Sequence, residues 1–355
     1  MTHPALARAE AFAATYGLRR PVLLAPMAGA CPPALSLAVM RAGGLGACGA
    51  LLMQPPAILA WAEAVREAGP FQINLWILDP APVRDPAHEA RLRAFLGGFG
   101  PAVAPEAGDA MPPDFFAQCE AVIQARPRIV SSIMGLYPPA LVARFKASGI
   151  AWWATVTTVA EALAAEAAGA DAVVAQGAEA GGHRGSFDPA RAEMAAVGLM
   201  ALLPAVVDAV TIPVVATGGI ADARGAAAAL LLGASAVQVG TGFLRCPEAG
   251  IASAWAEGLG RARPEETRLT RAFSGRAGRS LAIEYVAAAA AADAPAPAPY
   301  PVQRGLTQAM REAAAEAGDL GRMQAWAGQA AGLARAVPAG EVLGGIWRGT
   351  GEMLG

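Results

Sequence analysis

Cysteine and histidine are scarce in this chain, which contains four of the first and three of the second among 355 residues. The cysteines are widely spaced and form no CxxC pair, so the sequence argues against disulfides and against zinc. They are Cys31, Cys48, Cys119 and Cys246. We therefore expect no metal centre.

Charge is also sparse: charged residues make up 16% of the chain, and the formal net charge is −2. This composition lacks the basic footprint that nucleic acid or an acidic membrane surface requires, so small molecules are the expected partners. The N-terminus shows no signal peptide. Three uncharged stretches, 21–40, 42–62 and 225–244, reach the roughly 20 residues of a membrane span, but Pro, Gly or a Gly turn divides each of them. We expect no membrane segment and a cytoplasmic location.

What the chain does contain is a repeated alternation of short apolar runs with Ala/Leu-rich helical segments, which is typical of a parallel sheet. The predicted strands are Val22–Ala25, Leu45–Gly49, Phe71–Trp76, Ile129–Ile133, Ala151–Val156, Ala172–Ala175, Val214–Ala216 and Ala236–Val239. The predicted helices between them include Pro33–Ala42, Gln54–Ala68, Pro138–Ser148, Val159–Ala168, Met194–Ala209 and Ala223–Leu232. Eight such units predict a closed (β/α)₈ TIM barrel of the α/β class, with function on the loops after the strands.

Two segments depart from this repeat and predict a smaller, mostly helical region at the substrate side of the barrel. We divide the chain into a barrel at 1–260, with a Pro-rich lid loop at 79–113, and a small segment at 261–310 that contains an Ala/Pro linker. Residues 311–355 are predicted to be helices that pack back on the barrel, and Leu306–Ala317 and Met323–Ala336 show the strongest helical patterns.

One glycine motif is judged misleading. Residues 44–49 satisfy GxGxxG, but a helical pattern precedes them and the glycines run along the second predicted strand. A dinucleotide-binding motif must instead leave a strand and open a helix, so we set this interpretation aside.

Two later glycine loops favour a phosphate site. ATGGI at Ala216 and QVGTGF at Gln238 follow the seventh and eighth predicted strands, which is where barrels commonly bind phosphate. Backbone N–H groups of Gly218, Gly219, Gly240 and Thr241 can converge on an anion there. After the first strand, APMAG offers a flat surface, with Asn74 and Gln176 as amides for a ring edge. A flat ring with a phosphate tail indicates FMN.

The loop QGAEAGGHRG at Gln176 carries His183, the candidate catalytic residue. Glycines there allow close approach of the backbone to a ligand, and an imidazole commonly acts near neutral pH. A loop-capping histidine is the alternative, but the neighbouring motifs favour function.

Together these motifs resemble the nitronate monooxygenase family, FMN-dependent (β/α)₈ enzymes formerly called 2-nitropropane dioxygenases. The resemblance runs nearly the whole length and also includes INL at Ile73, SGRAGR at Ser274 and WAGQ at Trp326. It implies that His183 lies beside the flavin and that Tyr300 lines the substrate pocket, with an exposed linker tyrosine as the alternative. It implies FMN contacts from Ala25, Pro26, Met27, Asn74, Gln176, Gly181, Gly182, Gly218, Gly219, Gln238, Val239, Gly240 and Thr241.

The chain departs from the family pattern in the fourth strand. Many members carry a histidine there, in SxHFG, that is taken as the base for nitroalkanes, whereas this chain has Ile133, which we expect to contact the substrate. The resemblance therefore implies oxidation of nitronates by O₂ to a carbonyl compound and nitrite, with weak activity on neutral nitroalkanes.

Other functions stay open at this point. The same barrel serves flavin-dependent enoyl-thioester reductases, which consume NAD(P)H and share the EAGGH element. A dehydrogenase of the inosine-phosphate type would need a nucleophilic cysteine on a loop, and no cysteine of this chain follows that family's loop pattern. A non-catalytic FMN-binding module is a third alternative, because a fold does not dictate function. The oligomeric state is left open between monomer and homodimer.

Overall fold

The computed structural model describes residues 3–355 and contains an eight-stranded parallel barrel. Its strands are β1 (Val22–Leu24), β2 (Gly46–Gly49), β3 (Phe71–Trp76), β4 (Ile129–Ile133), β5 (Ala151–Val156), β6 (Ala172–Gln176), β8 (Val214–Thr217) and β9 (Ala236–Val239). From β2 onward each barrel strand pairs with the next, and β9 pairs with β1. A bridge between Leu23 and Leu45 brings β1 to the start of β2 and closes the ring. The predicted TIM barrel is confirmed.

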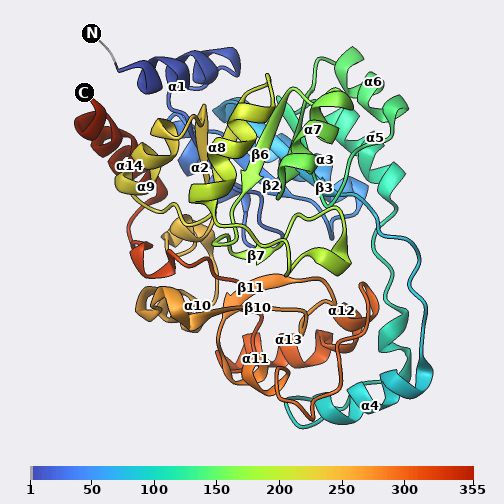
Figure 1. Cartoon of the computed structure of the whole chain (residues 1–355). Helices are drawn as coiled ribbons and strands as arrows, with labels where there is room; N and C mark the ends of the chain where they lie inside the picture. The colour runs from blue at the N-terminus through green and yellow to red at the C-terminus, as the bar shows by residue number, and fades with distance from the viewer. Residues whose placement is uncertain (1–2) are drawn as a thin grey trace.

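Helices surround the barrel (Figure 1). Several helices begin with proline, which suits the first helical position because it has no backbone N–H that needs a partner. The surrounding helices are α2 (Pro33–Arg41), α3 (Pro55–Val65), α5 (Phe115–Ala125), α6 (Pro139–Ala147), α7 (Val159–Ala167), α8 (Leu199–Ala209) and α9 (Ala223–Leu231). The last helix, α14 (Ala339–Leu354), packs on α9 and α2. Among residues 3–355, no helix is long and apolar enough to cross a membrane.

The N-terminal end of the barrel is closed by α1 (Pro4–Thr15). Phe12 and Tyr16 pack against Trp153 inside the barrel, with ring centroids 5.5 and 4.9 Å from the indole. This plug leaves the opposite end, where the strands point, available for a site. Figure 1 shows α1 at the end of the barrel that lies away from β10 and β11.

A second body, which we call the cover, lies over the C-terminal ends of the strands (Figure 1). Its small antiparallel sheet contains β7 (Gly182–His183), β10 (Thr267–Thr270) and β11 (Gly278–Leu281). Its helices are α4 (Pro86–Leu96), α10 (Ser253–Arg261), α11 (Glu284–Ala288), α12 (Val302–Leu306) and α13 (Gln308–Ala317). A separate apolar cluster joins Leu92 and Leu96 of α4 to Phe273, Leu306 and Met310. The segments at 79–113 and 261–317 therefore share one core.

Short 3₁₀ helices complete the chain at Arg66–Ala68, Pro105–Asp109, Pro189–Arg191, Thr241–Phe243, Pro247–Ala249, Pro264–Glu266 and Ala331–Leu333. The predicted helix at Met323–Ala336 is wrong, because only its 3₁₀ turn is helical. The backbone N–H groups of Ala327 and Gln329 instead bond to the carbonyls of Arg279 and Glu179. Tertiary hydrogen bonds thus replace the helical ones.

Two further boundaries differ from the prediction. The helix expected from Met194 begins only at Leu199, because the Glu179 carboxylate accepts the Leu199 N–H at 2.9 Å and marks the helix start. The segment predicted as a lid loop at 79–113 contains α4, whose first turn is capped by Asp85. The GxGxxG run at 44–49 enters β2 and opens no helix, as expected.

Candidate functional site

A cavity of about 360 Å³ lies at the C-terminal ends of the barrel strands, beneath the cover. Its wall includes Ile133, His183 and every predicted FMN contact except Val239. Val239 is fully buried among the apolar residues between strands and helices. Side chains alternate along a strand, so the Gln238 side chain faces the cavity and the Val239 side chain faces away from it.

The glycine loops after β8 and β9 form one end of the cavity. Gly218 and Gly219 adopt positive φ angles of 112° and 69°, which a side chain would strain. Thr241 accepts a hydrogen bond at 3.0 Å from the backbone of Gly328. A Cβ on Gly181 would lie 2.5 Å from that same Gly328 nitrogen. These loops therefore meet the segment around residue 328, an arrangement that the sequence did not predict.

The loop after β1 is held by a buried cysteine. The Cys31 sulfur accepts from the Met27 N–H at 3.2 Å and donates to the Ala25 carbonyl at 3.3 Å. Burial raises the pKa of the Cys31 thiol to about 12, so the thiol keeps its proton and can donate. Cys31 thus orders the APMAG loop, a role that no sequence motif indicates.

Amides form the floor of the cavity. Asn74 donates to the hydroxyl of Ser131 at 3.0 Å. Gln72 donates to Gln238 at 3.0 Å and accepts from Ser131 at 3.1 Å. This buried network holds Asn74 and Gln238 in fixed orientations at the cavity wall, as a ring edge would need.

Gln176 holds the loop that carries His183. Its amide nitrogen donates to the His183 carbonyl at 3.1 Å, and its amide oxygen accepts from Gly185 at 2.8 Å. The predicted flavin contact lines the cavity, but its amide mainly positions this loop. Glu179 in the same motif caps α8, so it too has a structural role.

The His183 ring lies between two indoles, with centroids 4.7 Å from Trp76 and 4.8 Å from Trp326. Its Nε2 lies 2.7 Å from the hydroxyl of Ser274. Burial, together with the positive charges of Arg276 and Arg304, lowers the pKa of His183 to about 3. The imidazole is therefore neutral at ordinary pH.

The two predicted substrate residues lie in different places. Ile133 lines the cavity. Tyr300 packs behind Trp76 in a tilted arrangement, with ring centroids 5.5 Å apart, and does not line the cavity itself. Its backbone approaches Gly275, where a Cβ would lie 2.6 Å from the Tyr300 nitrogen. Tyr300 thus supports the wall from behind.

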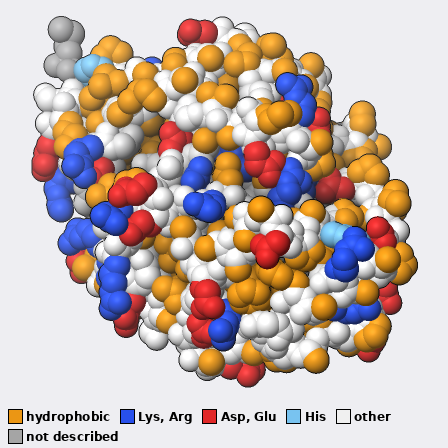
Figure 2. Space-filling view, turned by 60° about the horizontal axis from the view of Figure 1, so that its bottom comes forward, with side chains coloured by type: hydrophobic (Ala, Val, Ile, Leu, Met, Phe, Trp, Pro, Cys, Tyr) orange, Lys and Arg blue, Asp and Glu red, His pale blue; other side chains and the backbone are white. Residues whose placement is uncertain are grey.

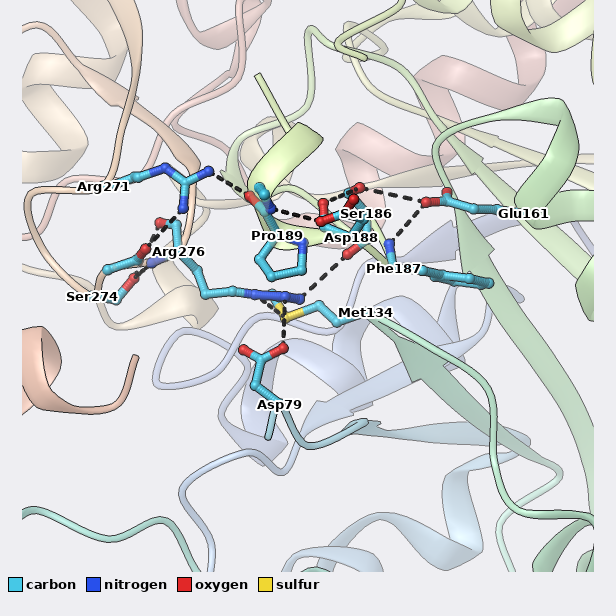
Figure 3. A network of polar contacts seen from close by, with 12 residues as sticks. Asp79, Met134, Glu161, Ser186, Phe187, Asp188, Pro189, Arg271, Ser274 and Arg276 are labelled. Carbon is cyan, nitrogen blue, oxygen red and sulfur yellow. Dashed lines mark hydrogen bonds and ion pairs between the residues drawn. The ribbon is translucent and has the colours of Figure 1, made fainter. Parts of the chain in front are cut away.

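SGRAGR also supplies a polar network that the sequence analysis missed (Figure 3). Arg276 pairs with Asp79 at 3.2 Å and donates to the Ser186 carbonyl at 3.3 Å. Its Nε lies 3.2 Å from the sulfur of Met134, which follows β4. The arginine therefore joins the start of the 79–113 segment to the loops after β4 and β6 and fixes the position of Ser274, two residues away.

A (β/α)₈ barrel with a glycine-lined cavity after its last two strands belongs to the class of barrels that frequently bind phosphate groups at that place. A family model described as nitronate monooxygenase matches residues 10–348. The chain belongs to this family, whose members are flavoprotein oxidoreductases.

Relatives and solved structures agree. The nitronate monooxygenase of Pseudomonas aeruginosa is 40% identical over 348 residues, which cover 94% of this chain and 97% of that protein. A nitroalkane oxidase from Streptomyces ansochromogenes superposes with a TM-score of 0.86 at 35% identity, covering 96% and 98% of the two chains. FabK from Thermotoga maritima superposes with a TM-score of 0.75 at 27% identity, covering 97% and 96%.

Proposed function

We propose that this protein is an FMN-dependent oxidoreductase that oxidises alkyl nitronates with O₂ to a carbonyl compound and nitrite. The observation that carries the proposal is one cavity that combines the glycine loops after β8 and β9 with the neutral His183. Family membership supports the reaction class.

The residues around the cavity fit FMN. Gly218, Gly219, Gly240 and Thr241 would hold the phosphate through backbone N–H groups, and Met27 would lie against the ring. Gly240 leaves this space open, since a Cβ there would lie 3.4 Å from the Met27 sulfur. When bound, FMN would accept electrons from the nitronate and pass them to O₂.

The protonation chemistry favours nitronates over neutral nitroalkanes. A nitronate is already an anion, whereas a nitroalkane must first lose its α-proton. Ile133 cannot take a proton, and a low pKa makes His183 a weak base. Loss of a general base typically costs about 10²–10⁴-fold in rate, so we expect nitroalkanes to react slower by this order.

Anaerobic stopped-flow spectroscopy of the FMN-loaded protein tests this function. Mixing with propyl-2-nitronate, 2-nitropropane and NADPH in turn separates the candidates. Rapid flavin bleaching by the nitronate, with slow bleaching by 2-nitropropane, is expected. Equal rates for both would show that another base, such as His183, removes the proton.

An NAD(P)H-dependent enoyl-thioester reductase with the same barrel is the second candidate, although FabK, at 27% identity, is a more distant neighbour than the nitronate monooxygenase at 40%. Rapid reduction by NADPH but not by the nitronate would move the protein to that function. A yellow protein inert to all three reagents would instead indicate a non-catalytic flavin module.

We also propose a cytoplasmic location, because all four cysteines are free and buried, which suits a reducing compartment. Cell fractionation with an antibody would test it, and recovery in a secreted fraction would contradict it. Sedimentation at several concentrations would distinguish the monomer from a homodimer.

A further inference from the structure

Arg304 differs from the other arginines around the site. Arg184, Arg276, Arg279 and Arg311 all donate hydrogen bonds to protein acceptors. Within residues 3–355, the Arg304 guanidinium has no hydrogen bond and no carboxylate within 4.0 Å. Arg304 is half-buried and lines the cavity.

A second cation stands beside it. Arg311 also lines the cavity, and its guanidinium donates to Thr307, to Gln324 and to the backbone carbonyl of Arg304, at 3.2, 3.1 and 3.1 Å. All three acceptors are neutral, so neither positive charge is balanced by them. The neighbouring Glu312 is exposed and bonds to Gln308 instead.

A half-buried positive charge without a counter-ion is unfavourable, because partly removing a cation from water is costly unless an anion compensates it. An anionic ligand in the cavity would provide that compensation. Arginine is suited to this task, because its planar guanidinium matches the two oxygens of a flat anion. A nitronate is such an anion, with its negative charge shared between two oxygens on one nitrogen.

The position of Arg304 favours the substrate over the cofactor phosphate. It lies four residues after Tyr300, which packs against Trp76, and its charge acts on His183. The glycine loops after β8 instead approach Gly177 and Glu179, at the other end of the 176–183 loop. Arg304 therefore belongs to the end of the cavity that contains the candidate catalytic histidine.

We propose that Arg304 is the anion receptor of this cavity and that it binds the nitronate group, so that the site selects the anion over the neutral nitroalkane. This inference rests on the proposed function. It adds a specificity-determining residue that compensates for the absent base at Ile133: the site takes a substrate that has already lost its proton.

Binding of an inert planar anion tests the proposal without turnover. The FMN-loaded protein is titrated with sodium nitrate at constant ionic strength, and the fluorescence of the cavity tryptophans and the flavin spectrum report binding. We expect Arg304→Gln to raise the Kd for nitrate at least tenfold and Arg304→Lys to raise it less. Arg268→Gln removes an exposed arginine outside the cavity and should leave the Kd unchanged.

Two further measurements separate the proposal from its alternatives. The Kd for FMN should be unchanged in Arg304→Gln, and the KM for propyl-2-nitronate should rise at least tenfold with the KM for 2-nitropropane little altered. An unchanged Kd for nitrate, or a loss of FMN affinity in place of nitrate affinity, would overturn the proposal. If wild-type protein binds nitrate through Arg304 but fails to oxidise nitronates, the receptor stands and the proposed function fails.

Discussion

At the scale of the residue, His183 shows how environment changes the chemistry of a side chain. It lies between Trp76 and Trp326, and Ser274 is its polar partner at 2.7 Å. An imidazole in such surroundings acts as a neutral hydrogen-bonding group over the ordinary pH range. Any role of His183 in the reaction therefore depends on how its ring is oriented and not on a change in its protonation state.

The pH dependence of stability should reveal this neutral imidazole. The pKa is about 3 in the folded protein against 6.5 for the ordinary group, so between these values the unfolded chain binds the proton and the folded chain does not. The free energy of unfolding should therefore fall as pH drops from 6.5 toward 3, by at most about 1.4 kcal/mol per pH unit from this group. Urea unfolding from pH 4 to 7 should show a shallower slope in His183→Gln, and identical slopes would contradict the assignment.

Ser274 should act as a positioning residue for His183. We expect Ser274→Ala to lower kcat for propyl-2-nitronate roughly fivefold, because a lost hydrogen bond of about 1 kcal/mol frees the ring to turn. KM and the midpoint of thermal unfolding should change little. Ser274→Thr, which keeps the hydroxyl, should restore activity. A thermal midpoint that falls in parallel with kcat would instead show a structural role.

At the scale of the element, the loop after β6 is fixed from both sides. β7 pairs with β11 of the cover, and Gln329 bonds to the carbonyl of Glu179. A single loop therefore joins the barrel, the small sheet and the C-terminal segment. Substitutions in the 176–183 loop should therefore weaken FMN binding by more than the accompanying loss of folding stability would explain.

Gly181→Ala tests this close contact. The new Cβ would lie 2.5 Å from the Gly328 nitrogen and 2.7 Å from the Ala327 carbonyl carbon, so backbone must move. We expect a loss of about 1–3 kcal/mol in stability and at least tenfold weaker FMN binding. The control is Gly149→Ala, where φ is +74° and no atom lies within 4 Å of the Cβ. It should cost about 1–2 kcal/mol and leave the FMN Kd unchanged. Equal FMN affinity in both variants would refute the contact.

At the scale of the whole molecule, two cores serve two tasks. One lies between the strands and the surrounding helices, and another holds the cover together. On the face shown in Figure 2, acidic and basic side chains are interspersed without a large patch of one sign. This agrees with small molecules as partners, because a nucleic-acid site needs a basic stripe.

Matched leucines separate the two cores. Leu343 of α14 and Leu306 of α12 are both fully buried, the first in the barrel core and the second in the cover. Leu343→Ala should lower global stability by about 2–5 kcal/mol through a cavity. Leu306→Ala should mainly speed hydrogen exchange in α4, α12 and α13 and weaken nitronate binding. Equal loss of exchange protection throughout both variants would show a single cooperative unit.

The sequence by itself determined the barrel and the location of its site. Apolar runs, helix periods and glycine loops are local signals, and they predicted all eight strands and the cavity-lining loops such as those at Gly218 and Gly240. Local signals suffice there because each unit of the barrel repeats the same short-range pattern.

Tertiary structure alone decided the contacts between distant segments. His183 meets Ser274 from 91 residues away, and Arg276 meets Asp79 from 197. Periodicity wrongly predicted a helix at Met323–Ala336, since backbone bonds to other loops replace helical ones there. The surrounding segments also decide the electrostatics of the site. Burial lowers the pKa of His183, and no acceptor from any segment pairs with the Arg304 guanidinium in the described residues, because desolvation and charge balance depend on every segment around a side chain.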